Sequence, residues 1–282
     1  MASLPSAHRT LVMGILNVTP DSFSDGGRWS STEAAIARGI ELASDGADIV
    51  DVGGESTRPG AERVEPGEEV SRVLPVIEAL ANEGIVVSVD TMRARTARAA
   101  VDAGACLVND VSGGLADPDM ARVVAELECD YVAMHWRAHS KEMNAHDHYD
   151  DVLAEVHHEL LQRAVTLQEA GVAPERIIID PGLGFSKAGD SNWALLAGMD
   201  VLRGLGPRIL IGASRKRFLG ATIGAGDGSA PRGADDRDDA TTAVTTLAAF
   251  HGAWAVRVHE PRPARDAIAV AAAWQNATST PE

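Results

Sequence analysis

The chain has 282 residues and a formal net charge of −16 at pH 7. This acidic excess excludes a general nucleic-acid binder, which needs a basic face, and a protein held on anionic membranes. No signal peptide and no apolar run of about 18 residues is visible, so we expect a cytoplasmic protein without a membrane span. Hydrophobic residues make up 45% of the chain and aromatic residues only 4%, so Ala, Val, Leu and Ile must fill the core.

Short runs rich in Val and Ile recur along the whole chain. Such β-branched runs are typical of strands that are buried on both faces of a parallel sheet. The eight predicted strands cover residues 10–18, 48–54, 85–90, 106–110, 131–136, 176–180, 208–214 and 255–259.

A segment with helical signals follows each run. The first begins with Ser and Thr and ends near a glycine, and the second has acidic residues in its first turn and a glycine stop. The helical segments cover residues 31–47, 66–84, 93–105, 117–128, 149–171, 191–202, 238–252 and 263–277.

Strand and helix thus alternate eight times with no linker between them. This pattern predicts an α/β fold with a single (β/α)8 TIM barrel over residues 1–282, with tails at 1–9 and 276–282. A doubly wound open sheet is the alternative. Eight equal units, and a last helix with no second domain after it, favour the barrel.

Three polar stretches are long enough to be functional loops. Residues 19–31 and 53–66 each follow a predicted strand, and residues 219–239 form a Gly- and Asp-rich stretch that we expect to be a disordered loop. In a barrel, the loops that follow strands gather on the C-terminal face, where ligands bind.

Polar side chains lie at the end of most predicted strands. A single Asp at a strand end is usually a helix cap or a turn former, but here many strands end in this way. Because these ends meet at one face of a barrel, they predict a binding site. The residues at these ends, of which only Met134 is apolar, are Asn17, Asp51, Glu55, Asp90, Asn109, Asp110, Met134, His135, Asp180, Ser214, Lys216, Arg257 and His259.

Carboxylates and amides in such a ring suit a flat heterocycle with several N–H donors. One Asp can accept two parallel hydrogen bonds from an amidine-like edge, as in guanine or a pterin, and Asn109 can read a mixed edge. The cations Arg58, Arg257 and His259 suit a phosphate or pyrophosphate. Lys216 can donate to the ring, although a Schiff base or an anion clamp with its neighbours is also open at this point.

Other chemical motifs are incomplete. "GASRK" lacks the last glycine of a nucleophile elbow, and no dinucleotide or phosphate-loop pattern is present. The histidines at 135, 139, 146 and 148 have no zinc-site spacing, and Cys106 and Cys129 belong to no metal motif. We expect both cysteines to be buried thiols in a reducing compartment.

Several motifs, in this order, resemble those of the dihydropteroate synthase family over almost the whole chain. The "AMHWR" segment at 133–137 is similar to actinobacterial members. The motifs are "MGILNVTPDSFSDGG" at 13–27, "DVGGESTRPGA" at 51–61, "SVDT" at 88–91, "NDVSGG" at 109–114, "DPGLGF" at 180–185, "GASRKRFLG" at 212–220 and "RVHE" at 257–260.

The resemblance implies a (β/α)8 barrel, usually a homodimer, that acts in folate biosynthesis and is the target of sulfonamides. The implied transferase reaction joins 6-hydroxymethyl-7,8-dihydropterin pyrophosphate to p-aminobenzoate, gives 7,8-dihydropteroate and pyrophosphate, and requires Mg²⁺.

The resemblance also implies roles for particular residues. The pterin slot would be formed by Asp90, Asn109, Met134, Asp180 and Lys216. The pyrophosphate would be bound by Asn17, Arg257 and His259, with Asn17 also holding Mg²⁺. The p-aminobenzoate pocket would be formed by Phe23, Thr57, Arg58, Pro59, Phe185 and Lys216. The catalytic set would be Asp25, Arg58, Asp90, Lys216 and Arg257.

One position departs from the family pattern. Many members have a Ser directly after the lysine of "SRK", near the p-aminobenzoate carboxylate, and this chain has Arg217. The carboxylate would then rely on the N-terminus of the following helix.

Two other functions fit part of the pattern. One is a non-catalytic paralogue that keeps only the pterin slot, but a binder has no need of loop residues such as Asp25 and Arg58. The other is a pterin-dependent methyltransferase barrel, which would leave the pyrophosphate residues and the "TPDSFSDGG" loop unexplained.

Overall fold

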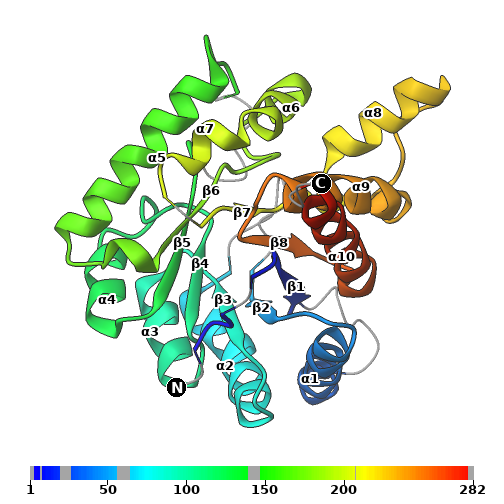
Figure 1. Ribbon diagram of the computed structural model, residues 1–282. Coiled ribbons are helices and arrows are strands. Elements are labelled where there is room, and N and C mark those ends of the chain that lie inside the picture. Colours follow the sequence, from blue (N-terminus) through cyan, green and yellow to red (C-terminus); the bar gives the residue numbers. More distant parts are fainter. Residues whose placement is uncertain are drawn as a thin grey trace.

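A closed parallel barrel forms the centre of the molecule. The computed structural model describes residues 3–6, 8–19, 27–55, 64–138, 147–206 and 208–278. Figure 1 shows the strands at the centre with the helices packed around them. The strands are β1 (Leu11–Asn17), β2 (Ile49–Gly53), β3 (Val87–Asp90), β4 (Leu107–Asp110), β5 (Asp130–Met134), β6 (Ile177–Asp180), β7 (Leu210–Ile211) and β8 (Ala255–Val258).

The strand order confirms the predicted fold class. Neighbouring strands are hydrogen-bonded in the order β6-β5-β4-β3-β2-β1-β8-β7, and all their pairings are parallel. A parallel bridge between Ile179 and Ile209 joins the two outer strands, and the Ile179 amide donates to the carbonyl of Arg208 at 3.0 Å. The sheet therefore closes on itself, which an open doubly wound sheet does not do.

Helices cover the outside of this barrel and follow the strands in turn. They are α1 (Gly27–Ser44), α2 (Pro66–Asn82), α3 (Ala94–Asp102), α4 (Met120–Leu127), α5 (Val152–Glu169), α6 (Gly189–Ala197), α7 (Met199–Arg203), α8 (Arg217–Asp227), α9 (Asp238–Phe250) and α10 (Pro261–Thr278), with 3₁₀ turns η3 (Pro174–Arg176) and η4 (Ala234–Arg237). None of the helices described is long and apolar enough to cross a membrane.

Local sequence signals explain several of these helix ends. Helix α5 begins after Asp151, whose carboxylate accepts hydrogen bonds from the amides of Leu153 and Ala154 at 3.1 Å. Helices α2 and α3 are followed by Gly84 and Gly104, which have φ angles of +76° and +114°. Only glycine adopts such angles without strain, so these two residues let the chain turn back into the next strand.

Three expectations about irregular segments are corrected by the structure. Residues 27–31, predicted as the end of the first long loop, form the start of α1. Residues 219–239, predicted as one disordered loop, contain most of α8, then η4, and the start of α9. Phe218, near the start of α8, is buried against Trp193 with the two rings edge to face at 5.1 Å. At the C-terminus, α10 continues through Thr278, so residues 276–278 are helical rather than a tail.

The barrel interior changes character along its axis. Its N-terminal part is a compact apolar cluster, formed by Leu11, Met13, Ile49, Cys106, Leu107, Val132, Ile178, Leu210 and Ala255. Side chains two residues further along the strands point to the same interior, and these include Asp51, Asn109, Asp180 and Arg257. The polar end is the C-terminal face of the barrel, where the strand–helix loops begin.

Candidate active site

The ends of β2, β3 and β4 lie side by side and place their polar residues together. In the parallel register, Gly53 pairs with Asp90, and Asp90 pairs with Asn109. A Cβ atom at Gly53 would lie 3.4 Å from that of Asp90, so glycine leaves room for this carboxylate at the strand end. In the next part of the barrel, Met134 at the end of β5 pairs with Asp180 at the end of β6. Four of the five residues predicted for the pterin slot therefore lie at the same end of the barrel, at the C-termini of their strands.

Arg257, which is half-buried, connects these strands through ion pairs to two buried carboxylates. Its Nε donates to Oδ2 of Asp51 at 2.6 Å, and its Nη2 donates to Oδ2 of Asp90 at 2.8 Å. Asp51 Oδ2 also accepts from Nδ2 of Asn109 at 2.9 Å. This orients the Asn109 amide, because its nitrogen faces Asp51 and its oxygen faces the other way.

Two carboxylates are held at the mouth at an electrostatic cost. Burial raises the pKa of Asp90 to about 7, although the cation of Arg257 opposes the shift. Burial also raises the pKa of Asp180, against the opposing charge of Lys216. Both carboxylates are therefore poorly solvated. Hydrogen-bond donors of a ligand would supply contacts that water does not make there.

Asp180 presents one free oxygen to the opening. Its Oδ1 accepts from the amide of Gly182 at 2.7 Å, whereas Oδ2 has no hydrogen bond with the described residues. A Cβ at Gly212, just after β7, would lie 3.7 Å from this Oδ2 and 4.0 Å from Nζ of Lys216. The absence of a side chain at Gly212 keeps the space between these two groups open.

Lys216 is held beside Asp180 by the loop that follows β6. Its Nζ donates to the carbonyl oxygen of Leu183 and lies 4.6 Å from the centre of the Phe185 ring. Burial lowers the pKa of Lys216 to about 8, although the charge of Asp180 opposes the shift. Lys216 is therefore the positive charge that acts most strongly on Asp180, and each group opposes the effect of burial on the other.

His259, another residue predicted to bind an anion, follows β8 and contacts Ser214, which follows β7. Nδ1 of His259 is 2.8 Å from the hydroxyl of Ser214, which also accepts from the His259 amide at 3.2 Å. Arg215 is no part of an anion clamp with Lys216, because its guanidinium is bound by Asp238 at 2.7 and 2.8 Å and by Glu260 at 3.1 Å.

Comparisons with known proteins identify the family of this chain. The family model "Pterin binding enzyme" matches residues 13–259. The chain is 52% identical to the dihydropteroate synthase of Mycobacterium leprae over 94% of each chain. The chain belongs to the dihydropteroate synthase family. Its activity is therefore that of a dihydropteroate synthase, a transferase of folate biosynthesis.

Two solved structures of the synthase from Xanthomonas albilineans have the same fold. The one with 4-aminobenzoic acid is 43% identical, has a TM-score of 0.87, and is matched over 97% of this chain and 95% of that chain. The one with 7,8-dihydropteroate is 41% identical, has a TM-score of 0.85, and is matched over 98% of this chain and 97% of that chain. These matches leave no support for the methyltransferase or the non-catalytic paralogue.

Some of the residues that the family resemblance selected lie outside the described part of the chain. These are Phe23, Asp25, Thr57, Arg58 and Pro59. Of the remaining expected residues, the structure brings Asp90, Asn109, Met134, Asp180 and Lys216 to one opening, with Arg257 between Asp51 and Asp90.

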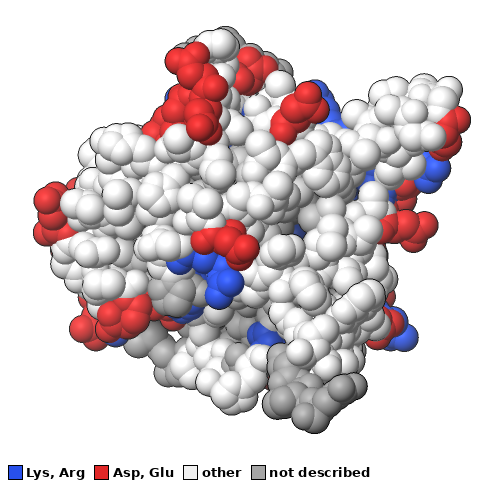
Figure 2. Space-filling model, turned by 45° about the horizontal axis from the view of Figure 1, so that its top comes forward, with Lys and Arg blue, Asp and Glu red and all other residues white. Residues whose placement is uncertain are grey.

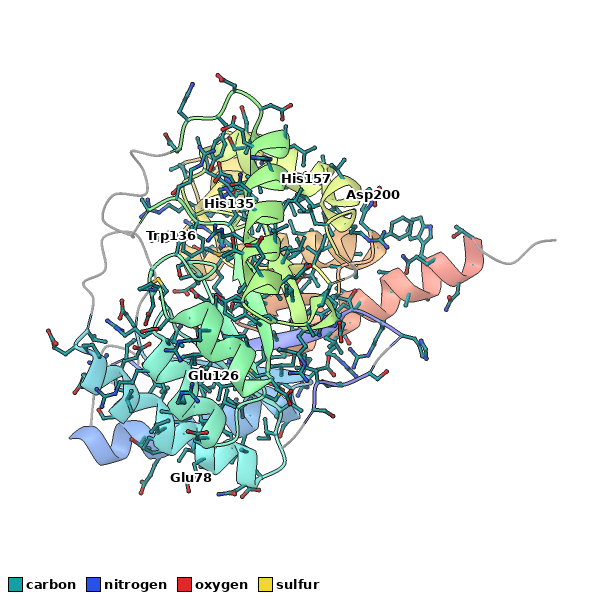
Figure 3. All side chains as sticks on the ribbon, turned by 90° about the vertical axis from the view of Figure 1, so that its left-hand side faces the viewer. Glu78, Glu126, His135, Trp136, His157 and Asp200 are labelled. Atoms are coloured by element: carbon teal, nitrogen blue, oxygen red, sulfur yellow. The ribbon has the colours of Figure 1, made fainter. Side chains whose placement is uncertain are left out.

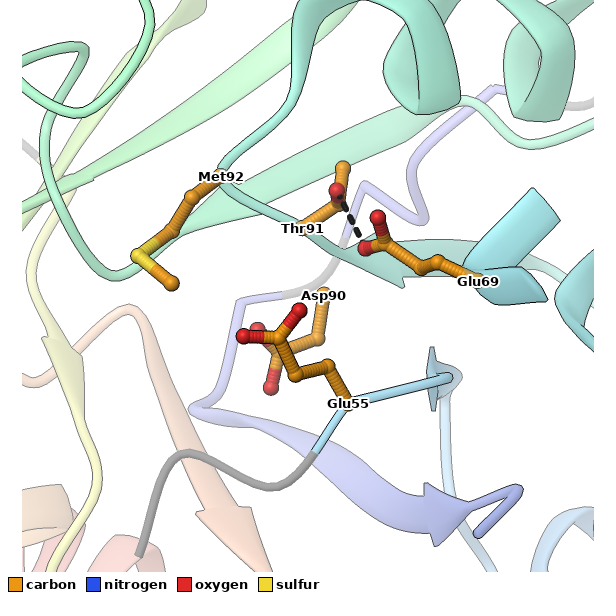
Figure 4. A pocket seen from close by; sticks show the side chains of 5 residues that line it. All are labelled: Glu55, Glu69, Asp90, Thr91 and Met92. Atoms are coloured by element: carbon orange, nitrogen blue, oxygen red, sulfur yellow. Dashed lines mark hydrogen bonds between the residues drawn. The ribbon is translucent and has the colours of Figure 1, made fainter. Parts of the chain in front are cut away.

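A cluster beside Asp90 was not expected from the sequence. Figure 4 shows a small pocket lined by Glu55, Glu69, Asp90, Thr91 and Met92, with the Thr91 hydroxyl bound to Glu69 at 2.6 Å. Arg93 Nη1 binds Glu55 at 2.6 Å and Glu69 at 2.5 Å. Thr91 therefore supports this cluster, and no ligand role is needed to explain it.

The same arginine joins the two ends of the family's second loop. Nη2 of Arg93 donates to the carbonyl of Val64 at 2.6 Å, while Nη1 holds Glu55. These two residues border the stretch 56–63, which contains Thr57, Arg58 and Pro59. Sequence gave no signal for this, because an Arg three residues after a strand end looks like an ordinary surface charge.

Asp110, at the end of β4, has a structural role. Its carboxylate accepts from the amide and hydroxyl of Ser112 at 2.7 and 2.6 Å, from the amide of Gly114 at 3.0 Å and from the hydroxyl of Tyr131 at 2.7 Å. These contacts use both oxygens to shape the turn after β4, so Asp110 forms no part of the slot.

Proposed function

We propose that the mouth of the barrel joins 6-hydroxymethyl-7,8-dihydropterin pyrophosphate to p-aminobenzoate, giving 7,8-dihydropteroate and pyrophosphate. The observation that carries this proposal is the free Oδ2 of Asp180, a largely buried residue, which lies near Lys216 across the space at Gly212. Such a carboxylate suits the 2-amino and N3–H edge of a pterin, which offers two parallel donors.

The remaining pterin contacts follow from the groups around Asp180. Lys216 donates to an acceptor of the ring, and the oxygen of Asn109 accepts because its nitrogen is bound to Asp51. Met134, which is 3% exposed, forms an apolar wall for the flat ring. The slot therefore combines acceptors and a donor with one apolar surface, as a heterocycle site requires.

Arg257 and His259 bind the pyrophosphate in this proposal. Without substrate, the guanidinium of Arg257 is paired with Asp51 and Asp90 and its side chain is 20% exposed. A guanidinium has five N–H donors, so it can keep the carboxylate contact of Nε and turn another edge to phosphate oxygens. His259 is kept beside it by Ser214.

Mg²⁺ would be held by Asn17 and the pyrophosphate oxygens. Asn17 ends β1 next to Gly53, and its side chain has no hydrogen bond with the described residues. The described part of the chain has no cluster of three His, Cys, Asp or Glu that would hold a metal. This fits a magnesium ion that is bound largely by substrate phosphates and water. The bound ion would neutralise charge on the leaving pyrophosphate.

The chemical step is a substitution at the pterin methylene carbon. The C–O bond to pyrophosphate breaks with its electron pair on oxygen, the p-aminobenzoate nitrogen forms the new C–N bond, and that nitrogen loses a proton. The amine is neutral at pH 7 and needs little activation, so departure of pyrophosphate is the harder part. Arg257 stabilises the leaving charge, and the carboxylate of Asp90 stabilises positive charge on the ring and methylene.

p-Aminobenzoate would bind against Phe185 and Lys216, with Phe23, Thr57, Arg58 and Pro59 of the two loops closing the pocket. At the position where relatives have Ser, Arg217 is exposed and begins α8. The amides of this helix start lie directly after Lys216 and suit the carboxylate of the substrate. We further propose that Asp25 aids the cation once the first loop has closed.

A homodimer is also proposed, because α9 and α10 present an apolar face to solvent. Leu247, Phe250, Val270 and Trp274 are 60%, 38%, 58% and 66% exposed, and the rings of Phe250 and Trp274 lie edge to face at 6.5 Å. A patch of this kind is typical of a protein–protein contact. The buried thiols of Cys106 and Cys129 support a reducing compartment such as the cytoplasm.

We propose that pterin pyrophosphate binds first and p-aminobenzoate second, and calorimetric titration tests this order. Because the p-aminobenzoate pocket forms only over bound pterin pyrophosphate, p-aminobenzoate alone should give no binding heat. The variant Asp25→Ala should bind pterin pyrophosphate normally and lose turnover. Equal losses of pterin pyrophosphate binding and of turnover in this variant would contradict the proposal that Asp25 acts only after the first loop has closed.

A further inference from the structure

We propose that Lys187 is a positioning residue for p-aminobenzoate. Its buried ammonium holds the loop of residues 181–186 in the shape that places Phe185 and Lys216. This inference rests on the proposed function, because it assigns the p-aminobenzoate side of the pocket to Phe185.

The loop that follows β6 has an unusual backbone. Gly182, Gly184 and Ser186 have φ angles of +68°, +75° and +48°, so every second residue is in the left-handed region. For Ser186 this conformation is uncommon and needs support from the surrounding structure. The alternation turns carbonyl groups of this loop toward the interior, where a donor must meet them.

Lys187 supplies that donor. Its Nζ donates to the carbonyls of Gly182 at 3.0 Å and Phe185 at 2.9 Å, and it is 3.0 Å from Nδ1 of His135. An ammonium has three donors and no acceptor, so these three contacts use all of them. The residue is only 9% exposed, and burial lowers its pKa to about 7, although the charges of Asp180 and Glu159 oppose the shift.

The third contact ties the loop to helix α5. When Lys187 is an ammonium it can only donate, so Nδ1 of His135 accepts, and Nε2 then carries the proton that Glu159 accepts at 2.9 Å. Burial lowers the pKa of His135 to about 4, which agrees with a neutral ring at pH 7. Figure 3 labels His135 and Trp136 beside α5, at the end of β5.

Two contacts connect the loop of residues 181–186 to Lys216 in the proposed p-aminobenzoate pocket. The carbonyl of Leu183, inside the loop, accepts from Nζ of Lys216, and the ring of Phe185 lies 4.6 Å from the same nitrogen. Lys187 binds the carbonyl of Phe185 itself. A shift of the loop would therefore move the aromatic wall and the lysine together, while Asp90, Asn109 and Arg257 on other strands stay in place.

Lys187→Met tests the proposal, because it keeps the length of the side chain and removes its donors. We expect the KM for p-aminobenzoate to rise by about tenfold or more. The Kd for pterin pyrophosphate should rise less, by about three- to fivefold, because Lys216 is only one of several pterin contacts. Hydrogen exchange of the peptide 181–187, measured without substrate, should become about tenfold faster or more.

Two further variants separate positioning from general stability. Arg208→Met removes an ion pair to Asp130 of 2.6 Å at the opposite end of the barrel, and should lower Tm without changing either substrate constant. Tyr149→Phe removes the hydroxyl that donates to the Ser186 carbonyl at 2.9 Å, and should raise the KM for p-aminobenzoate by about two- to fivefold even if Lys187→Met does not fold.

The outcomes distinguish this inference from the proposed function. Unchanged exchange of peptide 181–187 in Lys187→Met would overturn the inference, whatever the activity. So would a KM for p-aminobenzoate within about twofold of wild type, or an equal loss of pterin affinity. Failure of the wild-type protein to condense the two substrates would instead overturn the proposed function.

Discussion

The two ends of the barrel interior differ, although the same strands form both. Ile49, Leu107, Ile178 and Ala255 lie in the apolar N-terminal cluster, which we call the floor. Two residues further along each strand stand the residues of the mouth, which are Asp51, Asn109, Asp180 and Arg257. One pair of residues along a strand therefore separates a packed core from a binding site.

The floor contributes to stability, and the mouth is built for ligand binding. The floor buries apolar surface and so supplies stability, at about 25 cal/mol for each Å² removed from water. The mouth buries carboxylates whose pKa values burial raises, which indicates a cost to stability. Figure 2 shows Lys and Arg in only small separate groups on the face that it draws.

The largest expected effect is at the floor. Ile178→Ala leaves a cavity in a fully buried cluster and should lower the free energy of unfolding by about 2–5 kcal/mol. Pterin affinity of the folded protein should stay close to wild type. Denaturant unfolding and calorimetry measure the two quantities, and a tenfold loss of affinity would show that floor and mouth are coupled.

Asp180→Asn, two residues further on, should have the opposite profile. It removes a charged acceptor from the slot and should weaken pterin binding by about 2–4 kcal/mol. Since burial raises the pKa of Asp180, replacing the carboxylate should leave the free energy of unfolding at pH 8 unchanged or higher. Near wild-type affinity by calorimetry would contradict the assignment of this residue.

The mouth should also set the pH dependence of kcat/KM for pterin pyrophosphate. Asp90 must be ionised, and its pKa is raised to about 7, so activity falls as the pH drops below that value. Lys216 must be protonated, and its pKa is lowered to about 8, so activity also falls above it. In Lys216→Arg the alkaline fall should move to higher pH, and an unchanged alkaline limb would remove Lys216 from this role.

The smallest effect is expected at Ser88, between floor and mouth. Its hydroxyl and Oδ1 of Asp51 are buried without a hydrogen-bond partner among the described residues. Ser88→Ala should change the free energy of unfolding by less than about 1 kcal/mol and leave kcat/KM unaltered. A larger destabilisation would indicate that a buried water joins Ser88 to Asp51.

Sequence was sufficient for the architecture because each strand and helix is signalled locally. All eight strand positions are confirmed, although β7 is only Leu210–Ile211 where residues 208–214 were predicted. The length of helix α8 was underestimated because the glycines after residue 219 resemble a loop, and its anchor is the distant contact between Phe218 and Trp193. Such a contact depends on the folded chain and cannot be read from composition.

The mouth was predictable for a different reason, since parallel strand ends must meet at one face. Lys187 and Arg93 could not be found in this way, because neither lies at a strand end. Each acts on backbone carbonyls of a loop, Lys187 on Gly182 and Phe185 and Arg93 on Val64. Carbonyl groups are present at every residue, so the sequence carries no sign of which ones a distant cation will bind.

Pyrophosphate release tests the central claim most directly. Wild-type protein with pterin pyrophosphate and Mg²⁺ should release pyrophosphate only when p-aminobenzoate is added, with one dihydropteroate formed for each pyrophosphate. Asp180→Asn should show the same dependence at a much lower rate. Pyrophosphate release that is indifferent to p-aminobenzoate, or no release at all with both substrates present, would contradict the account.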